Sequence, residues 1–490
     1  MAGGNRLRLV AAGLLSVAVI TTDAGAQNDG NPLPEAPAAV VKNVRPPDGR
    51  RNERPIPLPT GKVTTPRAGE RNSYGLRVTP ELAEAYAAFL ANDGERTLAA
   101  LARASAPSRP DIRWVHNSLR AHAMIMMGRA ADAEEELQNA ARLEIAAFGK
   151  SLNTRALRAE ARLWLGDLDG AIADASLVAE ETKRWRLPTS YSNRPSDNEI
   201  LHMVWQTTAQ LRAYAILAGA HLLRGQADVA LPWAEEAEQR FNDVHFVAAM
   251  PDAQGVLPVH GDSWVGRAQN LVFVGTARTI VRRDPAAGDS AFNAARRFFE
   301  AIGFAAGSAT TDAFRAWSLF AIGRMAEGEP IAAQAVQQAN AIGLIDLVWR
   351  VEAARGEALL ALNRAADAEQ AFRRAQVAVD TVSGGLATDR SKRRFGVSKE
   401  DITYRLAAIA AARNDPDQLF ESLERGRARA FVDLLADRSA GVAQERATLL
   451  QVRDLDRRIR QERIAATGLG ASPQAAQRET DLRRQRETLM

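Results

Sequence analysis

A recurring spacing of small residues constrains the fold of this 490-residue chain more than any other feature. A Gly or Asn ends an apolar stretch of helical periodicity, five residues later an Ala or Leu opens the next stretch, and a further small residue follows seven positions on. Gly and Asn suit a left-handed turn, and antiparallel helices joined by a tight turn approach closely only where the facing side chains are small. The marks are Gly128 with Ala133 and Ala140, Gly225 with Ala230 and Ala237, Gly328 with Ala333 and Asn340, Asn363 with Ala368 and Ala375 and, more loosely, Gly166 with Ala171 and Asn414 with Leu419 and Gly426.

The distances between these marks predict an irregular repeat array. Successive marks are 38, 59, 103, 35 and 51 residues apart, whereas a strict repeat of helical pairs would give about 34. The longest gap should contain a degenerate pair around Asp284-Pro285. We therefore expect six to eight helical pairs with insertions, and such an array suits a chain too long for one compact core.

The marks resemble those of tetratricopeptide repeats over roughly residues 79 to 436. The first helix is expected at Thr79-Pro80-Glu81, where a capping Thr precedes a Pro at the first helical position. The resemblance implies an all-α, tetratricopeptide-like α-solenoid with irregular repeats over residues 79–440. The alternative is a generic helical bundle.

The N-terminal part has the composition of an export signal followed by a spacer. Residues 1–26 combine Arg6 and Arg8, an apolar stretch and the triplet Ala24-Gly25-Ala26, which predicts a signal peptide cleaved near Ala26 and a periplasmic or secreted protein. Residues 27–78 hold many prolines and almost no aromatic residue, which predicts a disordered Pro-rich tether, and we favour a plain spacer over a docking motif. The alternative for residues 1–26 is an uncleaved amphipathic helix.

Composition and motifs exclude several classes of function. The net charge of +4 is spread thinly, so no nucleic-acid partner is indicated, and we interpret the excess of Arg and Ala as coding bias. No apolar stretch of the mature chain reaches the length of a membrane span. The chain has no cysteine, no phosphate-binding loop and no His pair at helical zinc-ligand spacing. We expect no catalytic residue, no metal and no cofactor, and hence no enzyme.

Two insertions interrupt the helical periodicity, at residues 184–199 and 242–264. Long insertions in compact arrays are often functional. Their aromatic residues are candidate contacts for a partner, or else pin the loops onto the helices: Trp185, Tyr191, Phe246 and Trp264.

The segment LERGRARAFVDLL, residues 423–435, resembles the helix that closes the repeat region of CHAT-domain proteins, which are caspase-like peptidases carried behind tetratricopeptide repeats. The matching positions are Tyr404, Glu424, Arg427, Ala428, Arg429, Asp433 and Leu434. Without the resemblance, the segment is a charged amphipathic helix of a final repeat. Residues 441–490 predict a charged helical hairpin or short coiled coil. In the family the peptidase would begin beyond this point, so we expect a truncated form or a companion chain that supplies it.

These features together predict an exported scaffold that binds a peptide or a partner domain on its helical-repeat surface. The alternative is the regulatory repeat half of a CHAT-type peptidase, with the peptidase domain as its partner. An intracellular transcription regulator is disfavoured by the signal sequence and by the lack of a basic DNA-reading helix.

Overall fold

The structure is a computed structural model in which the described residues are 33–35, 46, 67–70, 78–104, 109–187, 196–249, 261–386, 395 and 400–424, with 455, 458, 474, 477, 478, 481, 482, 484 and 485. Every regular element among these residues is a helix, so the predicted all-α class is confirmed. The chain divides into two compact units, Met1–Ala332 and Ala333–Met490. The division falls inside α14 (Met325–Ala341).

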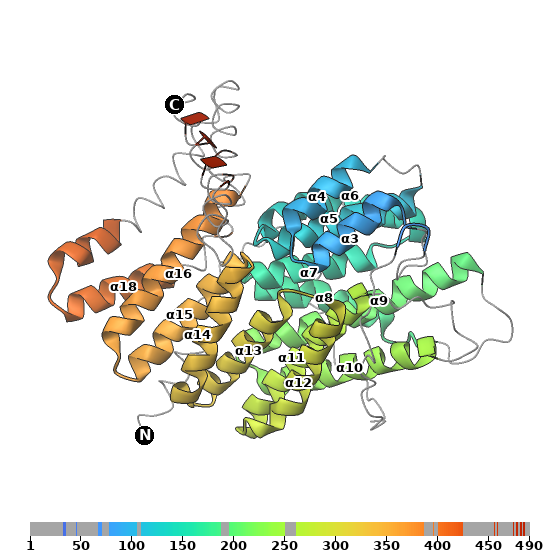
Figure 1. Ribbon diagram of the computed structural model, residues 1–490. Helices are drawn as coiled ribbons and strands as arrows, with labels where there is room; N and C mark the ends of the chain where they lie inside the picture. The colour runs from blue at the N-terminus through green and yellow to red at the C-terminus, as the bar shows by residue number, and fades with distance from the viewer. Residues whose placement is uncertain are drawn as a thin grey trace. The chain divides into compact units, whose positions relative to one another are not determined.

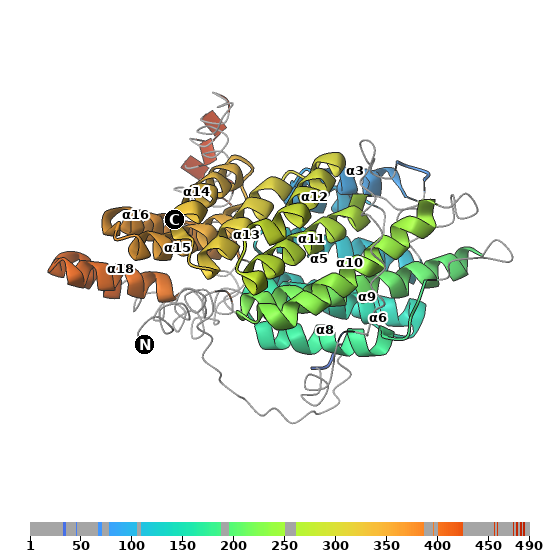
Figure 2. The same cartoon turned by 90° about the horizontal axis from the view of Figure 1, so that it is seen from below.

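The first unit is built from antiparallel helical pairs (Figure 1). Each helix packs on its pair partner, and the first members of successive pairs, α5, α7, α9, α11 and α13, pack on one another. This consecutive packing is that of an α-solenoid, as predicted. The pairs are α3 (Pro80–Leu90) with α4 (Gly94–Arg103), α5 (Pro110–Met126) with α6 (Ala130–Phe148), α7 (Leu152–Leu165) with α8 (Leu168–Thr182), α9 (Asp197–Leu223) with α10 (Ala227–Ala249), and α11 (Gly261–Arg282) with α12 (Ala286–Ile302), followed by α13 (Gly307–Ala321). Figure 2 shows α9 to α12 lying side by side.

The second unit continues the same plan. Helix α15 (Ile345–Ala361) packs on α16 (Ala365–Gly385), which packs on α18 (Glu400–Ala412), and residues 416–424 form a further helix. Leu455 and Leu482, one from each predicted arm of the hairpin, are buried together. Most of the hairpin, the signal peptide and most of the tether lie outside the described residues.

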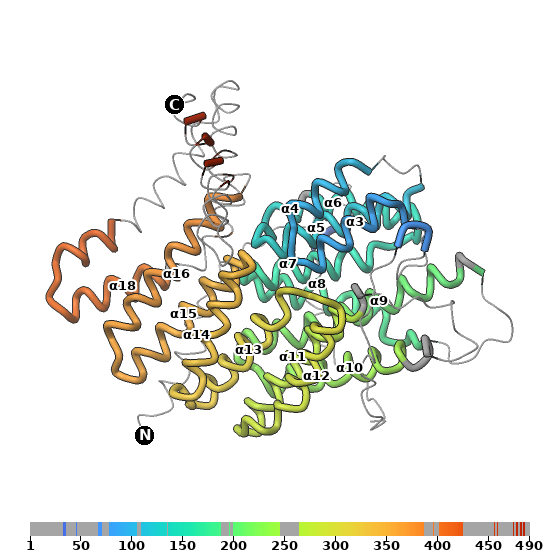
Figure 3. Tube along the Cα trace, viewed as in Figure 1, coloured from blue at the N-terminus to red at the C-terminus, as the bar shows by residue number. Residues whose placement is uncertain are grey.

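Left-handed turn residues separate the two helices of each pair, as the Cα trace in Figure 3 allows the reader to follow. The predicted turn residues Gly128, Gly166, Gly225, Asn363 and Asn414 all have positive φ, between 54° and 87°. The small residues five positions after the first four of them are fully buried. Thr79 caps α3, because its Oγ1 accepts a hydrogen bond from the Leu82 N–H at 3.3 Å. The spacing of small residues therefore marks real helix turns and helix contacts.

The predicted turn residue Gly328 is wrong by five positions. Gly328 lies inside α14, and the turn residue is Gly323, with a φ of 87°. A Cβ on Gly328 would lie 2.6 Å from the Phe320 ring, so Gly328 occupies the close-contact position five residues after the turn. The next small residue of the pattern is then the buried Ala335, whereas the predicted Asn340 is exposed.

The degenerate pair expected near Asp284-Pro285 is present as α11 and α12. Its turn residue is Arg283, with a φ of 51°, which breaks the Gly or Asn rule. The small residue five positions on is Gly288, where a Cβ would meet the Gly275 carbonyl oxygen at 2.4 Å. The repeat therefore persists where its turn residue is no longer recognisable.

The second predicted insertion is shorter than expected. Residues 242–249 belong to α10 and residues 261–264 to α11, which leaves only 250–260 between the helices, outside the described residues. Both helix ends are extended by packing, since the His245 ring stacks on Trp264 with 4.1 Å between ring centroids. Within the part of the chain that the structure describes, no helix combines the length and the apolar character needed to cross a membrane.

Candidate functional site

Three arginines on one face of α7 form the most unusual polar cluster of the first unit. Arg155, Arg158 and Arg162 follow one another at helical spacing, and each is at most 6% exposed. We call them the arginine ladder. Asp174 of α8 is fully buried and accepts hydrogen bonds from Arg155 Nη1 at 2.8 Å and from Arg158 Nη2 at 2.6 Å, and its Oδ2 lies 3.1 Å from Arg162 Nη1. A single carboxylate is thus enclosed by three guanidinium groups.

The ladder holds a segment from the far N-terminal part of the chain, Leu33–Glu35. The Leu33 carbonyl accepts a hydrogen bond from Arg158 at 2.5 Å, and the Pro34 carbonyl accepts from Arg155 at 2.8 Å and from Arg158 at 3.2 Å. The Glu35 carboxylate accepts two hydrogen bonds from Arg162, at 2.8 and 2.5 Å. These are the parallel charge-assisted bonds that make Arg selective for carboxylates.

The Leu33 side chain fills an apolar pocket formed by α5, α6 and α7. It is 0% exposed, as deeply buried as the core leucine Leu137 beside it. Small residues make the room for it, because most of the wall consists of alanines. The buried wall residues are Ala121, Ile125, Ala130, Ala133, Leu137, Ala141, Leu157, Ala161 and Leu165. We call the pocket and the ladder together the α5–α8 groove. Residues 27–78 were interpreted as a plain spacer, yet three of them lie docked in this groove.

The electrostatics of the groove depend on Glu35. Burial lowers the pKa of Arg155, and the charge of Asp174 offsets this only in part. For Arg162, burial also favours the neutral form, but the hydrogen bonds that it donates to Glu35 and the charges of Asp174 and Glu35 outweigh burial, so the pKa of Arg162 is raised. Glu134 and Asp167 lie farther away, 3.9 and 3.8 Å from Arg162 Nε. Glu35 therefore supplies the closest second negative charge that a buried guanidinium cluster requires.

A buried carboxylate fixes the start of α7, and hence the direction of the ladder. Gly149 ends α6 in the left-handed conformation, and Glu144 of α6 reaches across the turn. It accepts hydrogen bonds from the backbone N–H groups of Asn153 and Thr154, both at 2.8 Å, and from the Trp205 indole at 2.6 Å. These N–H groups have no partner within the helix itself. Burial raises the pKa of Glu144 to about 7 against the effect of these bonds.

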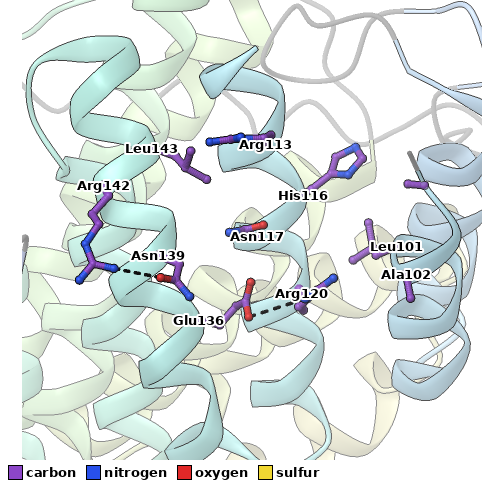
Figure 4. A pocket seen from close by; sticks show the side chains of 11 residues that line it. Leu101, Ala102, Arg113, His116, Asn117, Arg120, Glu136, Asn139, Arg142 and Leu143 are labelled. Carbon is purple, nitrogen blue, oxygen red and sulfur yellow. Dashed lines mark hydrogen bonds and ion pairs between the residues drawn. The ribbon is translucent and has the colours of Figure 1, made fainter. Parts of the chain in front are cut away.

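A second feature is a polar hollow of about 550 Å³ between α4, α5 and α6, drawn in Figure 4. Arg120 lies 3.8 Å from Glu136, and Arg142 donates to Asn139 at 3.0 Å. His116 is 7% exposed, and burial lowers its pKa, so its imidazole is neutral at pH 7. Its lining residues are Leu101, Ala102, Ala104, Arg113, His116, Asn117, Arg120, Glu136, Asn139, Arg142 and Leu143. The hollow is open and rimmed mainly by basic and amide groups.

Two of the predicted contact aromatics have described side chains, and both make contacts within the chain. The Trp185 indole donates to Thr207 Oγ1 at 2.9 Å. The Trp264 ring contacts the rings of His245 and Phe298. These are contacts of the kind expected if the aromatics pin insertions onto the helices, and their binding of a partner stays a prediction. Tyr191 lies outside the described residues, and Phe246 lies in α10 rather than in a loop.

The residues of the CHAT-like segment are described only in part. Tyr404 lies on α18 and is 59% exposed, and Glu424 lies in the helical residues 416–424. Arg427, Arg429 and Asp433 fall outside the described residues. Tyr404 and Glu424 belong to the second unit, whereas Trp185 and Trp264 belong to the first.

Sequence reasoning missed the groove, although weak signals for it exist. The run LNTRALRAEARLWL places three arginines at helical spacing among apolar residues, whereas the general Arg excess was interpreted as coding bias. Leu33 stands between two prolines and is followed two residues later by Glu35, which is unusual in a polar tether. Neither signal predicts that the two meet, because more than 120 residues separate them.

The described residues contain no group of three or more His, Asp or Glu side chains placed to hold a metal ion. The groove offers guanidinium donors, one buried carboxylate and an apolar pocket, which is the chemistry of recognition. No protein-family model matches this chain, and a search of curated protein sequences finds no significant match.

Proposed function

We propose that this chain is an exported protein–protein interaction scaffold, and that the α5–α8 groove binds a short segment of a partner protein. One observation carries the proposal: a non-helical stretch of the chain, Leu33–Glu35, already lies there with a fully buried leucine and a paired carboxylate. A surface that accepts one such segment has the pocket and the donors to accept another of the same chemistry.

The chemistry of the groove favours peptide over other ligands. Its donors are guanidinium groups that contact main-chain carbonyls and a carboxylate, and its pocket accepts an aliphatic side chain. A nucleic acid would offer phosphates but no aliphatic group for the pocket, and the net charge of the chain is only +4. Export rests on the predicted signal peptide at residues 1–26.

Site-specific photocrosslinking in the native host tests the scaffold function. Ala131 is partly buried against the Leu33 pocket, so a small diazirine-bearing amino acid at this position should crosslink a bound partner. The same amino acid at the exposed position 373 is the control. We expect a partner protein crosslinked at position 131 and not at 373. Crosslinks confined in every growth condition to the chain's own residues 27–40 would contradict the proposal, and recovery of the protein in the cytoplasm would contradict export.

A second candidate function is the regulatory repeat half of a CHAT-type peptidase. It is favoured by the large apolar side chains exposed next to the CHAT-like segment, Tyr404, Phe420 and Leu423, which are 59%, 66% and 44% exposed. A partner domain would cover such a surface. Sequencing past the codon for Met490, and inspection of the neighbouring reading frame, test it: a domain with a catalytic His and Cys is expected, and its absence from both places counts against this function.

A further inference from the structure

We propose that the α5–α8 groove recognises a short pattern, an aliphatic side chain followed two residues later by a carboxylate, and that Leu33–Glu35 occupies the groove in cis as a competitor of the partner. This inference rests on the proposed function, because it names the ligand class and the regulation of the same site. The partner is a protein segment that carries this pattern and displaces the chain's own segment.

The first position of the pattern is set by the pocket. Leu33 is 0% exposed and packs in one cluster with apolar residues of α5, α6 and α7. A polar side chain there would lose its hydrogen bonds to water without replacement. Because alanines line the pocket closely, an aliphatic side chain of leucine size fits it and a larger aromatic one would require the helices to separate.

The middle position is recognised through its main chain. Arg155 and Arg158 donate to the Pro34 carbonyl, and Arg158 also donates to the Leu33 carbonyl. Proline lacks the N–H group but keeps the carbonyl, and its fixed φ favours an extended chain. The side chain at this position is therefore not selected by these contacts, and proline reduces the entropy lost on binding.

The third position is set by Arg162. Its two terminal nitrogens contact the two oxygens of Glu35, so a carboxylate is bound in the geometry that guanidinium groups favour. A lysine at this position would add a positive charge to three guanidinium groups that share Asp174. The groove thus discriminates by charge at one end and by shape at the other.

The cis contact has the properties of an exchangeable ligand. It consists of one buried leucine, a few hydrogen bonds to carbonyls and an ion pair whose Glu35 side chain is 71% exposed. Water and a competing carboxylate can reach such an ion pair from outside. The segment joins the folded helices through the residues between Glu35 and Val78, so it competes as a tethered ligand with an effective concentration of up to about 1 mM.

A direct binding experiment tests both parts of the inference. The probe is the fluorescently labelled peptide NPLPEAP, which has the sequence of residues 31–37, and its binding is measured by fluorescence anisotropy. The protein is the chain from Gln27, either unchanged or with Leu33→Ala and Glu35→Ala together, which removes the cis ligand and leaves the groove intact. We expect the double variant to bind the peptide at least tenfold more tightly than the unchanged chain. Peptides that carry Ala in place of the leucine or Lys in place of the glutamate should bind neither protein.

The possible outcomes separate the two proposals. Equal binding of the peptide to both proteins overturns the cis competition and leaves the peptide-binding groove standing. Absence of binding to either protein overturns the groove as a peptide site, and with it the proposed function. Tight binding of the Ala or Lys peptide overturns the recognition pattern.

A second measurement covers the case in which the double variant does not fold. A protease recognition sequence inserted after Pro37 is cleaved in the otherwise unchanged, folded chain, so that the native segment remains bound without its tether. Cleavage should raise the affinity for the labelled peptide as the native segment is diluted away. An affinity that is unchanged after cleavage and gel filtration overturns the cis competition.

Discussion

Two buried arginine clusters of the first unit differ in where their partners come from. Arg267 of α11 is 0% exposed and finds all of its described partners on neighbouring helices: it donates to Glu238 at 3.1 and 2.6 Å, to His245 at 2.5 Å and to Asn242. The arginine ladder of α7 shares one buried carboxylate of a neighbouring helix, Asp174, and completes its contacts with Leu33–Glu35.

The difference separates a structural ion pair from a binding site. A buried guanidinium group must be paired, because its desolvation costs several kcal/mol. At Arg267 the helices themselves meet this requirement, so the cluster has no need of a ligand. At the ladder the requirement is met in part by Leu33–Glu35, a segment that lies more than 40 residues before the first described helix and belongs to none of the helices. We infer that buried arginines whose contacts are completed by a segment outside the helices, rather than burial of arginine as such, mark a site for a ligand.

The largest expected effect is at the carboxylate that the ladder shares. Asp174→Asn keeps the shape of the side chain but leaves three guanidinium groups without their common counter-charge. We expect the free energy of unfolding to fall by about 4 kcal/mol, as for other buried charge pairs that lose one partner. Urea unfolding followed by circular dichroism measures it. A loss below about 1 kcal/mol would mean that the ladder does not need this charge.

Removal of Arg267 should destabilise the protein without affecting the groove. Arg267→Met leaves Glu238 buried and unpaired, and burial already raises the pKa of Glu238, so we expect a loss of about 3 kcal/mol in the free energy of unfolding. Addition of Glu238→Gln should restore part of this loss, since an amide needs no counter-charge. Binding of the NPLPEAP peptide should stay within twofold of the unchanged chain, and a larger change would abolish the contrast between the two clusters.

Leucines that share one pocket should respond differently to truncation. Leu137→Ala creates a cavity inside packed helices and should cost about 3 kcal/mol of unfolding free energy. Leu33→Ala should cost only about 1 kcal/mol, because the segment can detach by local unfolding and the cost is limited to its docking. Urea unfolding of both variants gives the comparison. Equal losses would show that Leu33 belongs to the core and is no exchangeable ligand.

The smallest expected effect is the pH dependence of the Arg267 cluster. Burial and the charge of Arg267 hold the pKa of His245 well below 6.5. The unfolded chain therefore binds a proton below pH 6.5 that the folded chain does not, so stability is full above pH 6.5 and falls as the pH decreases. We expect His245 to contribute a loss of about 1 kcal/mol between pH 7 and pH 5.5.

The variant His245→Gln isolates this contribution. Glu144, with its pKa raised to about 7, acts in the opposite direction, because its folded form gains a proton as the pH falls from 7 toward 4.5. Glu144 is present in the unchanged chain and in the variant, so its contribution cancels when the two proteins' changes in unfolding free energy are compared. Urea unfolding at pH 7 and pH 5.5 should give a smaller fall in the free energy of unfolding for the variant than for the unchanged chain. An identical fall in both proteins would contradict a neutral buried His245.

Much of the fold followed from local rules, and the errors have identifiable causes. Thr79 and the turns at Gly128 and Gly225 were recognisable because capping and left-handed turns depend on a few adjacent residues. Gly328 was mistaken for the turn residue because the true turn residue, Gly323, is also a glycine and lies five positions earlier. Only the packing of Phe320 against Gly328 distinguishes the helix contact from the turn. The insertion at 242–264 was overestimated because stacking of His245 on Trp264 extends both helices.

The sequence by itself determined the class and the repeat of this protein, because helical periodicity, caps and small-residue spacing act over a single helical turn or one pair of helices. The tertiary structure alone decided the groove. Leu33 and Arg158 are 125 positions apart, and nothing in either local sequence specifies the other. Only the stacking of α5 to α8 places three arginines around one buried carboxylate beside an apolar pocket, where the distant Leu33–Glu35 segment completes their contacts.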